Sequence, residues 1–161
     1  FLAFSYPFMK RITYWPQLFL GITFNWGIIM AWAAMNIEIS SDIIILYISA
    51  IFWTLGYDTI YGAQDMSDDE IIGLKSTSIK FKKNIRTFVT AVYLISAILI
   101  LYLFMNYLGK NIFTIFLILF IFTLLYQLIN LNNNNAKNYL KLFKFNNYSG
   151  LFLFLGIFTI N

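Results

Sequence analysis

The chain has 161 residues, of which 60% are hydrophobic and 11% are charged, and a mean hydropathy of +0.74, which excludes a water-soluble domain and indicates an integral membrane protein. It contains no cysteine and no histidine, so disulfides, thiol nucleophiles and the usual zinc ligands are excluded and any metal site must use oxygen ligands. The net charge is +4, but the basic residues are not interleaved with an exposed aromatic surface, so we expect no nucleic-acid binding.

Four apolar segments are each long enough to cross a bilayer of about 30 Å. They run over residues 18–35, 43–60, 88–107 and 112–131. Asn25, inside the first segment, is interpreted as a hydrogen bond between helices rather than a substrate contact. The polar stretch Asn130 to Asn147 predicts a mobile connection. Gly150 to Ile160 is too short to cross alone, and we interpret it as the first half of a truncated fifth span rather than a re-entrant segment.

The basic residues gather on one side of this predicted topology. Ten of the eleven lysines and arginines precede the first segment, follow the second or follow the fourth. The opposite side carries Glu38, Asp42 and only Lys110. By the positive-inside rule, the loop after the second segment faces the cytoplasm, or the matrix of a mitochondrion. We therefore expect the chain to lie in the lipid bilayer of a bacterial cytoplasmic membrane or a mitochondrial inner membrane.

The segment from Tyr57 to Ser78 holds five of the seven acidic residues. They are Asp58, Asp65, Asp68, Asp69 and Glu70. Like charges this close to lipid are costly unless a cation neutralises them, so they indicate a cation site. On one continuous helix, spacings of seven and four residues would place Asp58, Asp65 and Asp69 on one face, with Asp68 beside them. Such a cluster suits Mg²⁺, which uses one or two carboxylates and takes other ligands from water and phosphate.

A short tail after these carboxylates offers groups that can hold a phosphate. Gly73 is expected to release the helix into a turn, and Lys75, Ser76 and Thr77 then supply one ammonium and two hydroxyl groups. The opposing interpretation is a solvated loop in which acidic and basic side chains pair loosely, each pair contributing about 0 to 1 kcal/mol. Asp68 and Glu70 fit that interpretation because they lie off the predicted face or at its edge.

Two stretches of the chain resemble one family. The first consists of YDTIY at 57–61, QD at 64–65, DD at 68–69 and GLKST at 73–77. It is similar to the second aspartate-rich motif of the UbiA superfamily of intramembrane aromatic prenyltransferases, and most similar to the branch that acts on 4-hydroxybenzoate. The second stretch resembles the segment that opens the second half of those enzymes. It consists of YPFMKR at 6–11, PQ at 16–17, LG at 20–21 and WG at 26–27.

The resemblance implies a fold and a place within it. The family fold is an all-α transmembrane bundle of nine helices with the second motif after the sixth helix, so residues 1–161 would supply about helices five to nine of one domain. The family's first motif, Asn-x-x-x-Asp-x-x-x-Asp, does not occur in the chain. The chain starts at Phe1 rather than methionine and stops inside an apolar run. We therefore expect a C-terminal portion that is inactive alone. The alternative is a half-length protein that another chain completes.

The resemblance also implies a reaction and roles for residues. A polyprenyl group would move from polyprenyl diphosphate to the ring of 4-hydroxybenzoate, a step of ubiquinone synthesis. Asp65 and Asp69 would bind Mg²⁺ and act in catalysis with Lys75, which would stabilise charge on the departing diphosphate. Binding of the metal and diphosphate would also involve the remaining polar groups of the motif, which are Asp58, Asp68, Ser76 and Thr77. The open alternatives are a relative for another aromatic acceptor, a transporter or channel fragment, and a structural half of a scaffold.

Overall fold

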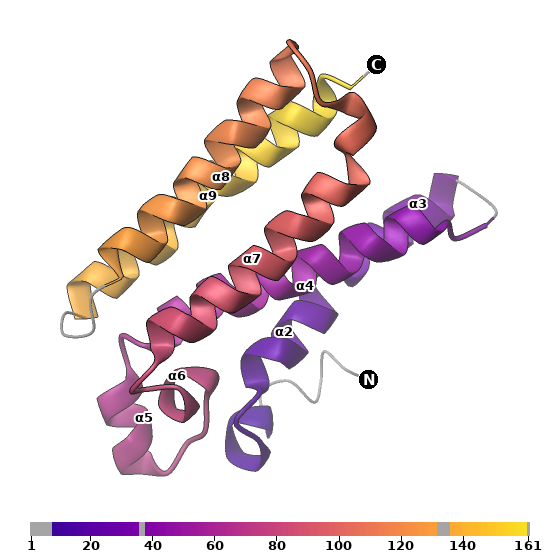
Figure 1. Ribbon diagram of the computed structural model, residues 1–161. Helices are drawn as coiled ribbons and strands as arrows, with labels where there is room; N and C mark the ends of the chain where they lie inside the picture. The colour runs from indigo at the N-terminus through magenta and orange to yellow at the C-terminus, as the bar shows by residue number, and fades with distance from the viewer. Residues whose placement is uncertain (1–7, 36–37, 132–135, 161) are drawn as a thin grey trace.

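The computed structural model describes residues 8–35, 38–131 and 136–160, and every regular element in these ranges is helical (Figure 1). A helical turn at residues 8–12 precedes α2 (Pro16–Phe24), α3 (Trp26–Met35), α4 (Ser41–Gly62), α5 (Met66–Ile72), α6 (Thr77–Lys80), α7 (Ile85–Leu103), the 3-10 helix η1 (Met105–Tyr107), α8 (Ile112–Asn130) and α9 (Ala136–Phe158). Four stretches are long and apolar enough to cross a membrane: α2 together with α3, α4, α7 and α8. The prediction of an all-α, multi-pass bundle is therefore confirmed.

The first span is broken in the middle. Residues 18–35 read as one apolar segment, but α2 ends and α3 begins on either side of Asn25. The Asn25 side-chain amide donates to the Gly21 carbonyl at 2.8 Å, the Ala50 carbonyl at 3.3 Å and the Thr54 hydroxyl at 2.8 Å. Since Ala50 and Thr54 belong to α4, Asn25 ties the break to the neighbouring helix, as predicted for an interhelical hydrogen bond.

The last helix begins earlier than the sequence predicts. We expected a mobile connection to Asn147 and a short span from Gly150, but α9 is one helix of 23 residues, so both expectations are wrong in the described part of this region. Two of its asparagines bond to neighbouring elements: Asn138 donates to the Asn130 carbonyl at 2.7 Å, and Asn146 accepts from Trp53 at 2.9 Å. Contacts with other helices thus stabilise α9, whose polar first half does not predict a helix from the sequence. Residues 132–135 lie outside the described ranges.

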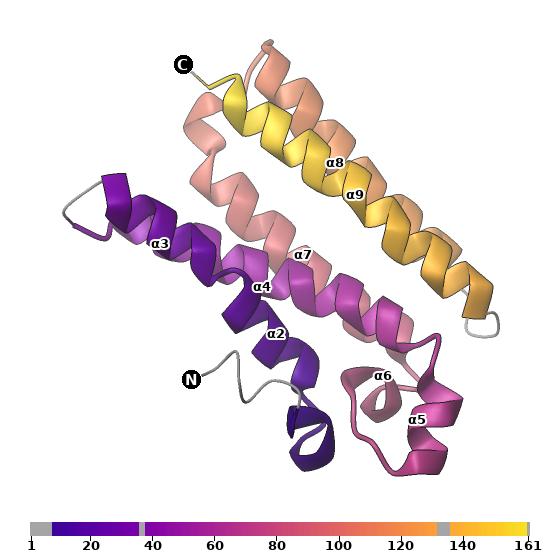
Figure 2. The same cartoon turned by 180° about the vertical axis from the view of Figure 1, so that it is seen from behind.

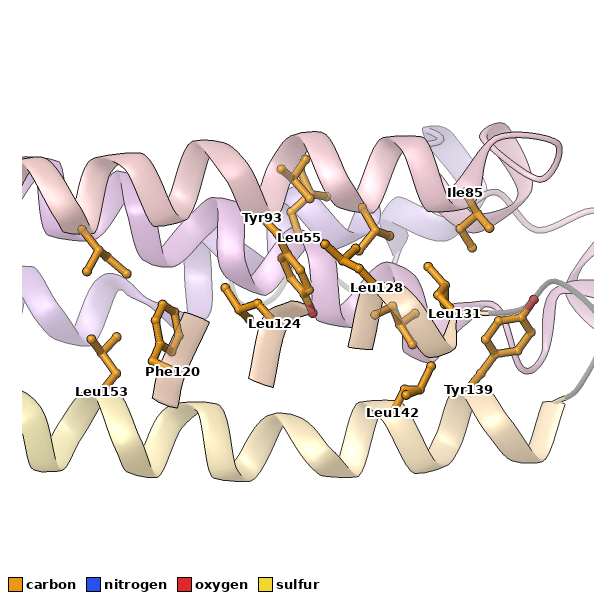
Figure 3. Close-up of a cluster of buried hydrophobic side chains, with 14 of the residues drawn as sticks. Leu55, Ile85, Tyr93, Phe120, Leu124, Leu128, Leu131, Tyr139, Leu142 and Leu153 are labelled. Carbon is orange, nitrogen blue, oxygen red and sulfur yellow. The ribbon is translucent and has the colours of Figure 1, made fainter. Parts of the chain in front are cut away.

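Helix α4 is the centre of the arrangement. It packs against α2 and α3 on one side and against α7 and α9 on another, while α8 and α9 form an antiparallel pair alongside α7 (Figures 1 and 2). The approach of α4 to α7 is close, because a Cβ atom at Gly56 would lie 2.2 Å from the ring of Tyr93. Figure 3 shows Leu55, Tyr93 and Phe120 among the apolar side chains that fill the space between α4, α7, α8 and α9.

Polar side chains inside this core are hydrogen-bonded to one another. The Tyr93 hydroxyl donates to Gln127 at 2.8 Å, and the amide of Gln127 donates to the Ser149 hydroxyl at 3.2 Å. Thr123 donates to the same hydroxyl at 2.7 Å. These four residues join α7, α8 and α9. Because lipid offers no competing water, such bonds hold the helices in register even though each is worth only about 0.6 to 2 kcal/mol.

The helix ends separate into two groups. The end of α4, the short helices α5 and α6, and the start of α7 lie together at one end of the molecule (Figures 1 and 2). The end of α8 and the start of α9 lie at that same end, whereas α7 turns into α8 at the other. The acidic segment and the basic residues of α9 therefore share one end of the bundle, which agrees with the predicted alternation of the loops.

Candidate functional site

The helix that carries Asp58 ends before the other carboxylates. Helix α4 stops at Gly62, and Asp65 is the residue that precedes α5. The prediction that Asp58, Asp65 and Asp69 share one continuous helix face is therefore wrong. Helix α4 ends close to its neighbours, because a Cβ atom at Gly62 would lie 2.8 Å from the Ser78 hydroxyl and 3.1 Å from the Gln17 amide. After this contact the chain leaves the axis of α4.

Asp65 and Asp69 keep the predicted spacing. The Asp69 amide donates to the Asp65 carbonyl at 2.9 Å, so the two residues lie one helical turn apart at the start of α5. Their surroundings differ. The carboxylate of Asp65 is exposed and accepts a hydrogen bond from Gln64 at 3.2 Å. Asp69 is 8% exposed, and Asp68 between them is exposed.

Asp69 is paired with a lysine from the start of the chain. The Lys10 ammonium lies 3.4 Å from one carboxylate oxygen of Asp69. This separation is long for a charge-assisted hydrogen bond, which is usually about 2.7 to 2.9 Å, and it leaves the second oxygen without that contact. Glu70, the next residue, pairs instead with Lys82 at 2.5 Å. The buried carboxylate of the motif therefore depends on a cation that comes from another part of the chain.

Lys75 joins the same two segments. Its backbone amide donates to the Lys10 carbonyl at 2.7 Å, and its ammonium donates to the Ile12 carbonyl at 3.2 Å and lies 5.6 Å from the ring centre of Tyr14. The two stretches that carry the family resemblance are thus in direct contact. Sequence reasoning included Lys10 in the second stretch but gave it no role. Its only signal was its position on the same predicted side as the acidic motif.

The turn after α5 forms as predicted. Gly73 adopts φ +80°, a left-handed conformation that favours glycine, and it ends α5. The Leu74 amide then donates back to the Asp69 carbonyl at 2.8 Å. This turn reverses the chain directly after the carboxylates. It brings Lys75 back beside the helical turn at residues 8–12.

Ser76 and Thr77 are directed into the fold. The Ser76 hydroxyl accepts from the Ile79 amide at 3.2 Å and caps α6. The Thr77 hydroxyl bonds to the Thr59 hydroxyl at 2.7 Å, while its amide donates to Gln17 at 3.0 Å. Both side chains are buried. Both hydroxyls thus support the loop in this structure, while Lys75 stays near the surface, and the predicted phosphate contacts of Ser76 and Thr77 stay a prediction.

The carboxylates fit part of a metal site. Among the described residues, no three Asp, Glu, His or Cys side chains form a group that could hold a metal ion. Asp65 and Asp69, one turn apart, supply the two carboxylates that a Mg²⁺ ion with water and phosphate ligands commonly uses. Asp58 is half-buried in the last turns of α4 and lies close enough to Lys10, the partner of Asp69, for the two charges to interact.

An aromatic surface adjoins the acidic end of α4. The ring centres of Tyr57 and Tyr61 on α4 lie 6.0 and 4.6 Å from that of Phe143 on α9. Trp53 packs edge-on to Tyr57 at 6.1 Å, and its indole is held by Asn146. Tyr57 lies half-buried between α4 and α9.

The chain was compared with known proteins. It is 38% identical to the 4-hydroxybenzoate octaprenyltransferase of Vibrio atlanticus (strain LGP32) over 161 residues, which cover 98% of this chain and 55% of the relative. It is 52% identical to the mitochondrial 4-hydroxybenzoate polyprenyltransferase of Homo sapiens over 84 residues, 52% of this chain and 23% of the relative. The chain thus spans about half the length of the bacterial relative.

The fold and the family agree with these similarities. The apo structure of a UbiA homolog from Aeropyrum pernix K1 superimposes with a TM-score of 0.73 at 23% identity, covering 97% of this chain and 60% of that one. This match supports the fold alone. The model of the UbiA prenyltransferase family matches residues 1–155. The chain therefore belongs to the UbiA prenyltransferase family.

Proposed function

We propose that this chain takes part in the transfer of a polyprenyl group from polyprenyl diphosphate to the ring of 4-hydroxybenzoate, a step of ubiquinone synthesis. The names of the similar bacterial and mitochondrial proteins support the choice of substrates. One observation of the structure carries the proposal. Asp65 and Asp69 lie one turn apart at a helix end, Lys10 pairs with Asp69, and the Lys75 amide donates to the Lys10 carbonyl.

The proposed diphosphate site uses both signs of charge. Asp65 and Asp69 would hold Mg²⁺, which when bound neutralises negative charge on the diphosphate. Lys75 lies on the turn directly after these carboxylates, and its ammonium would pair with the oxygens on which charge develops as the carbon–oxygen bond breaks. Lys10 neutralises the buried Asp69 from the other side. Asp58 and Asp68 remain proposed as additional ligands of the metal and diphosphate.

The aromatic surface suits the other product of that bond cleavage. When the diphosphate departs, the allylic carbon becomes cation-like, and aromatic faces stabilise such a centre by about 2 kcal/mol where water is excluded. Tyr57, Tyr61 and Phe143 present rings next to the acidic end of α4. The ring carbon beside the hydroxyl of 4-hydroxybenzoate then attacks the allylic carbon and loses its proton. The surrounding apolar helices limit the access of water, which would otherwise quench the cation.

The location of the site follows from the charge distribution. We propose that the acidic motif faces the cytoplasm or the mitochondrial matrix, because most basic residues lie at the same end of the bundle. A water-soluble diphosphate head would then meet the motif at that surface. The apolar tail of the donor would remain in the membrane between helices.

A direct assay tests this function. The complete reading frame that encodes this chain and the 161-residue chain alone are expressed in membranes lacking the endogenous activity, and each is supplied with polyprenyl diphosphate, 4-hydroxybenzoate and Mg²⁺. We expect prenylated 4-hydroxybenzoate from the complete reading frame, its loss with EDTA, and no product from the 161 residues alone. Absence of product with 4-hydroxybenzoate, but product with another aromatic acceptor, would overturn the proposed acceptor. Absence of product with every acceptor would favour the transporter alternative.

A further inference from the structure

Three backbone amides at residues 74–77, the loop that follows α5, donate to other parts of the chain. Their acceptors are the Asp69 carbonyl for Leu74 at 2.8 Å, the Lys10 carbonyl for Lys75 at 2.7 Å and the Gln17 side-chain oxygen for Thr77 at 3.0 Å. The first two acceptors are main-chain groups, which no change of side chain removes. The third belongs to a side chain. The position of the loop therefore depends on the identity of residue 17.

The Thr77 amide needs an acceptor from outside its own helix. Thr77 is the first residue of α6, and the first amides of a helix have no carbonyl partner within that helix. Ser76, the residue before it, accepts from Ile79 and leaves the Thr77 amide without a partner in α6. Thr77 is fully buried, and an unpaired amide in such a place is costly. Gln17 supplies the missing acceptor from α2.

Gln17 is itself enclosed by other residues of this chain. It is the second residue of α2, directly after the buried Pro16, and only 3% of it is exposed. A Cβ atom at Gly62 would lie 3.1 Å from its amide nitrogen. The Gln17 side chain therefore lies between the end of α4 and the loop, and its contact with Thr77 is already buried by described residues.

Two helices hold the loop in different ways. On the side of α4, the Thr77 hydroxyl bonds to the Thr59 hydroxyl, and the Ser78 hydroxyl donates to the Thr59 carbonyl, both at 2.7 Å. On the side of α2, the bond is that of Gln17 to the Thr77 amide. The contacts with α4 use side chains of the loop, whereas Gln17 holds its backbone. Loss of the Gln17 oxygen would therefore release the backbone from α2 while the attachment to α4 remains.

We propose that Gln17 is a positioning residue for Lys75, which lies two residues before the bond to Thr77. This role rests on the proposed prenyl transfer, in which Lys75 stabilises charge on the departing diphosphate. Gln17 does not touch the metal or the diphosphate, but fixes the backbone from which the Lys75 side chain extends. Electrostatic stabilisation requires groups that are in place before the reaction, so a shift of the loop by about 1 Å weakens it.

Hydrogen exchange tests the placement of the loop without turnover. The protein from the complete reading frame is purified in detergent with Gln17→Met, which keeps the length of the side chain and removes its oxygen. Exchange of the peptide that covers residues 74–80 should become about fivefold faster, the effect of one hydrogen bond. Gln17→Glu retains an oxygen acceptor and should exchange as slowly as the unaltered protein. Equal exchange in Gln17→Met and the unaltered protein would overturn the proposal.

Gln127→Met is the matched control. Gln17 and Gln127 are the two buried glutamines among the described residues, and Gln127 bonds to Tyr93 and Ser149 in the core of α7, α8 and α9. This control should destabilise the protein without changing exchange at residues 74–80. Faster exchange of that peptide in both methionine variants would show a general loss of stability and would overturn the specific role of Gln17.

Kinetics test the link to Lys75. Gln17→Met should raise the KM for polyprenyl diphosphate about fivefold, whereas loss of folded protein alone would lower kcat and leave KM unchanged. In the Lys75→Gln background the same change should alter KM less than twofold, because the group that Gln17 positions is already absent. An equal effect in both backgrounds, or an unchanged KM, would overturn the proposal.

Two further outcomes are distinguishable. If Gln17→Met does not fold, Gln17→Asn takes its place with the same expected results, because its amide is one carbon shorter and does not reach Thr77. If the unaltered protein forms no product, the proposed prenyl transfer fails. Faster exchange confined to the Gln17 variants without the oxygen at that position would still support the placement of the loop by Gln17.

Discussion

At the scale of single residues, burial separates carboxylates that look alike in the sequence. Asp65, Asp68 and Asp69 lie within five positions, but only Asp69 is buried and paired with Lys10. The sequence predicted the pairing of Asp65 with Asp69 because the spacing of four survives on a short helix. It could not predict that α4 ends before Asp65, because that ending depends on contacts of Gly62 with Ser78 and Gln17.

The assigned metal role predicts unequal effects of three substitutions. Asp65→Asn or Asp69→Asn in the protein from the complete reading frame should reduce Mg²⁺-dependent turnover at least a hundredfold, because each removes a metal ligand, while membrane insertion stays normal. Asp68→Asn serves as the comparison and should be milder, since Asp68 is not part of the pair that lies one turn apart. Turnover is measured at several Mg²⁺ concentrations. Near-normal rates in either of the first two variants, or a larger effect of Asp68→Asn, would remove this assignment.

Lys75 and Thr77 should differ in the kind of defect that they cause. Thr77→Val removes the hydroxyl bond to Thr59 and should lower the stability of the protein in detergent by about 1 kcal/mol, the worth of one hydrogen bond, because the Thr59 hydroxyl keeps its bond to the Leu55 carbonyl. The KM for the prenyl diphosphate should change little. Lys75→Gln should raise that KM and lower kcat while stability changes less. A raised KM in Thr77→Val without loss of stability would instead favour Thr77 as a phosphate ligand.

At the scale of elements, hydropathy identified the four spans but not their internal geometry. The apolar character continues through Asn25, so the break between α2 and α3 has no hydropathy signal and depends on acceptors in α4. Conversely, the polar composition at the start of α9 led to the prediction of a mobile connection where the structure has a helix. Its period becomes visible only when the buried positions, such as Tyr139, Leu142 and Ser149, are known. Both errors arise because partners on other helices decide the outcome.

The close approach of α4 to α7 predicts that substitution of two glycines by alanine has different effects on stability. Gly56→Ala places a Cβ atom 2.2 Å from the Tyr93 ring, so the ring must move, and overpacking of this kind costs about 1 to 3 kcal/mol. Gly27→Ala has no atom within 4 Å of the added Cβ and should be neutral or slightly stabilising. Thermal unfolding in detergent measures both. Equal stability of the two variants would contradict the close packing of Gly56 on Tyr93.

At the scale of the whole molecule, the absence of cysteine permits a direct test of orientation. Ser67→Cys lies on α5 at the end that carries the motif, and Gly109→Cys lies between η1 and α8 at the other. Both positions are exposed. In inside-out vesicles a membrane-impermeant maleimide should label Ser67→Cys and spare Gly109→Cys, with the reverse pattern in right-side-out vesicles. Labelling of both from one side would contradict the crossing of the bilayer by α7.

The contact between residues 10–17 and the loop that follows α5 also has a consequence for assembly during synthesis. The bonds from Lys75 to Lys10 and Ile12, and from Thr77 to Gln17, connect the loop to a segment that leaves the ribosome about sixty residues earlier. Residues 10–17 have therefore already been synthesised when the loop after α5 leaves the ribosome. The polar half of the site can form before α8 and α9 are made, and Phe143 completes the aromatic surface last.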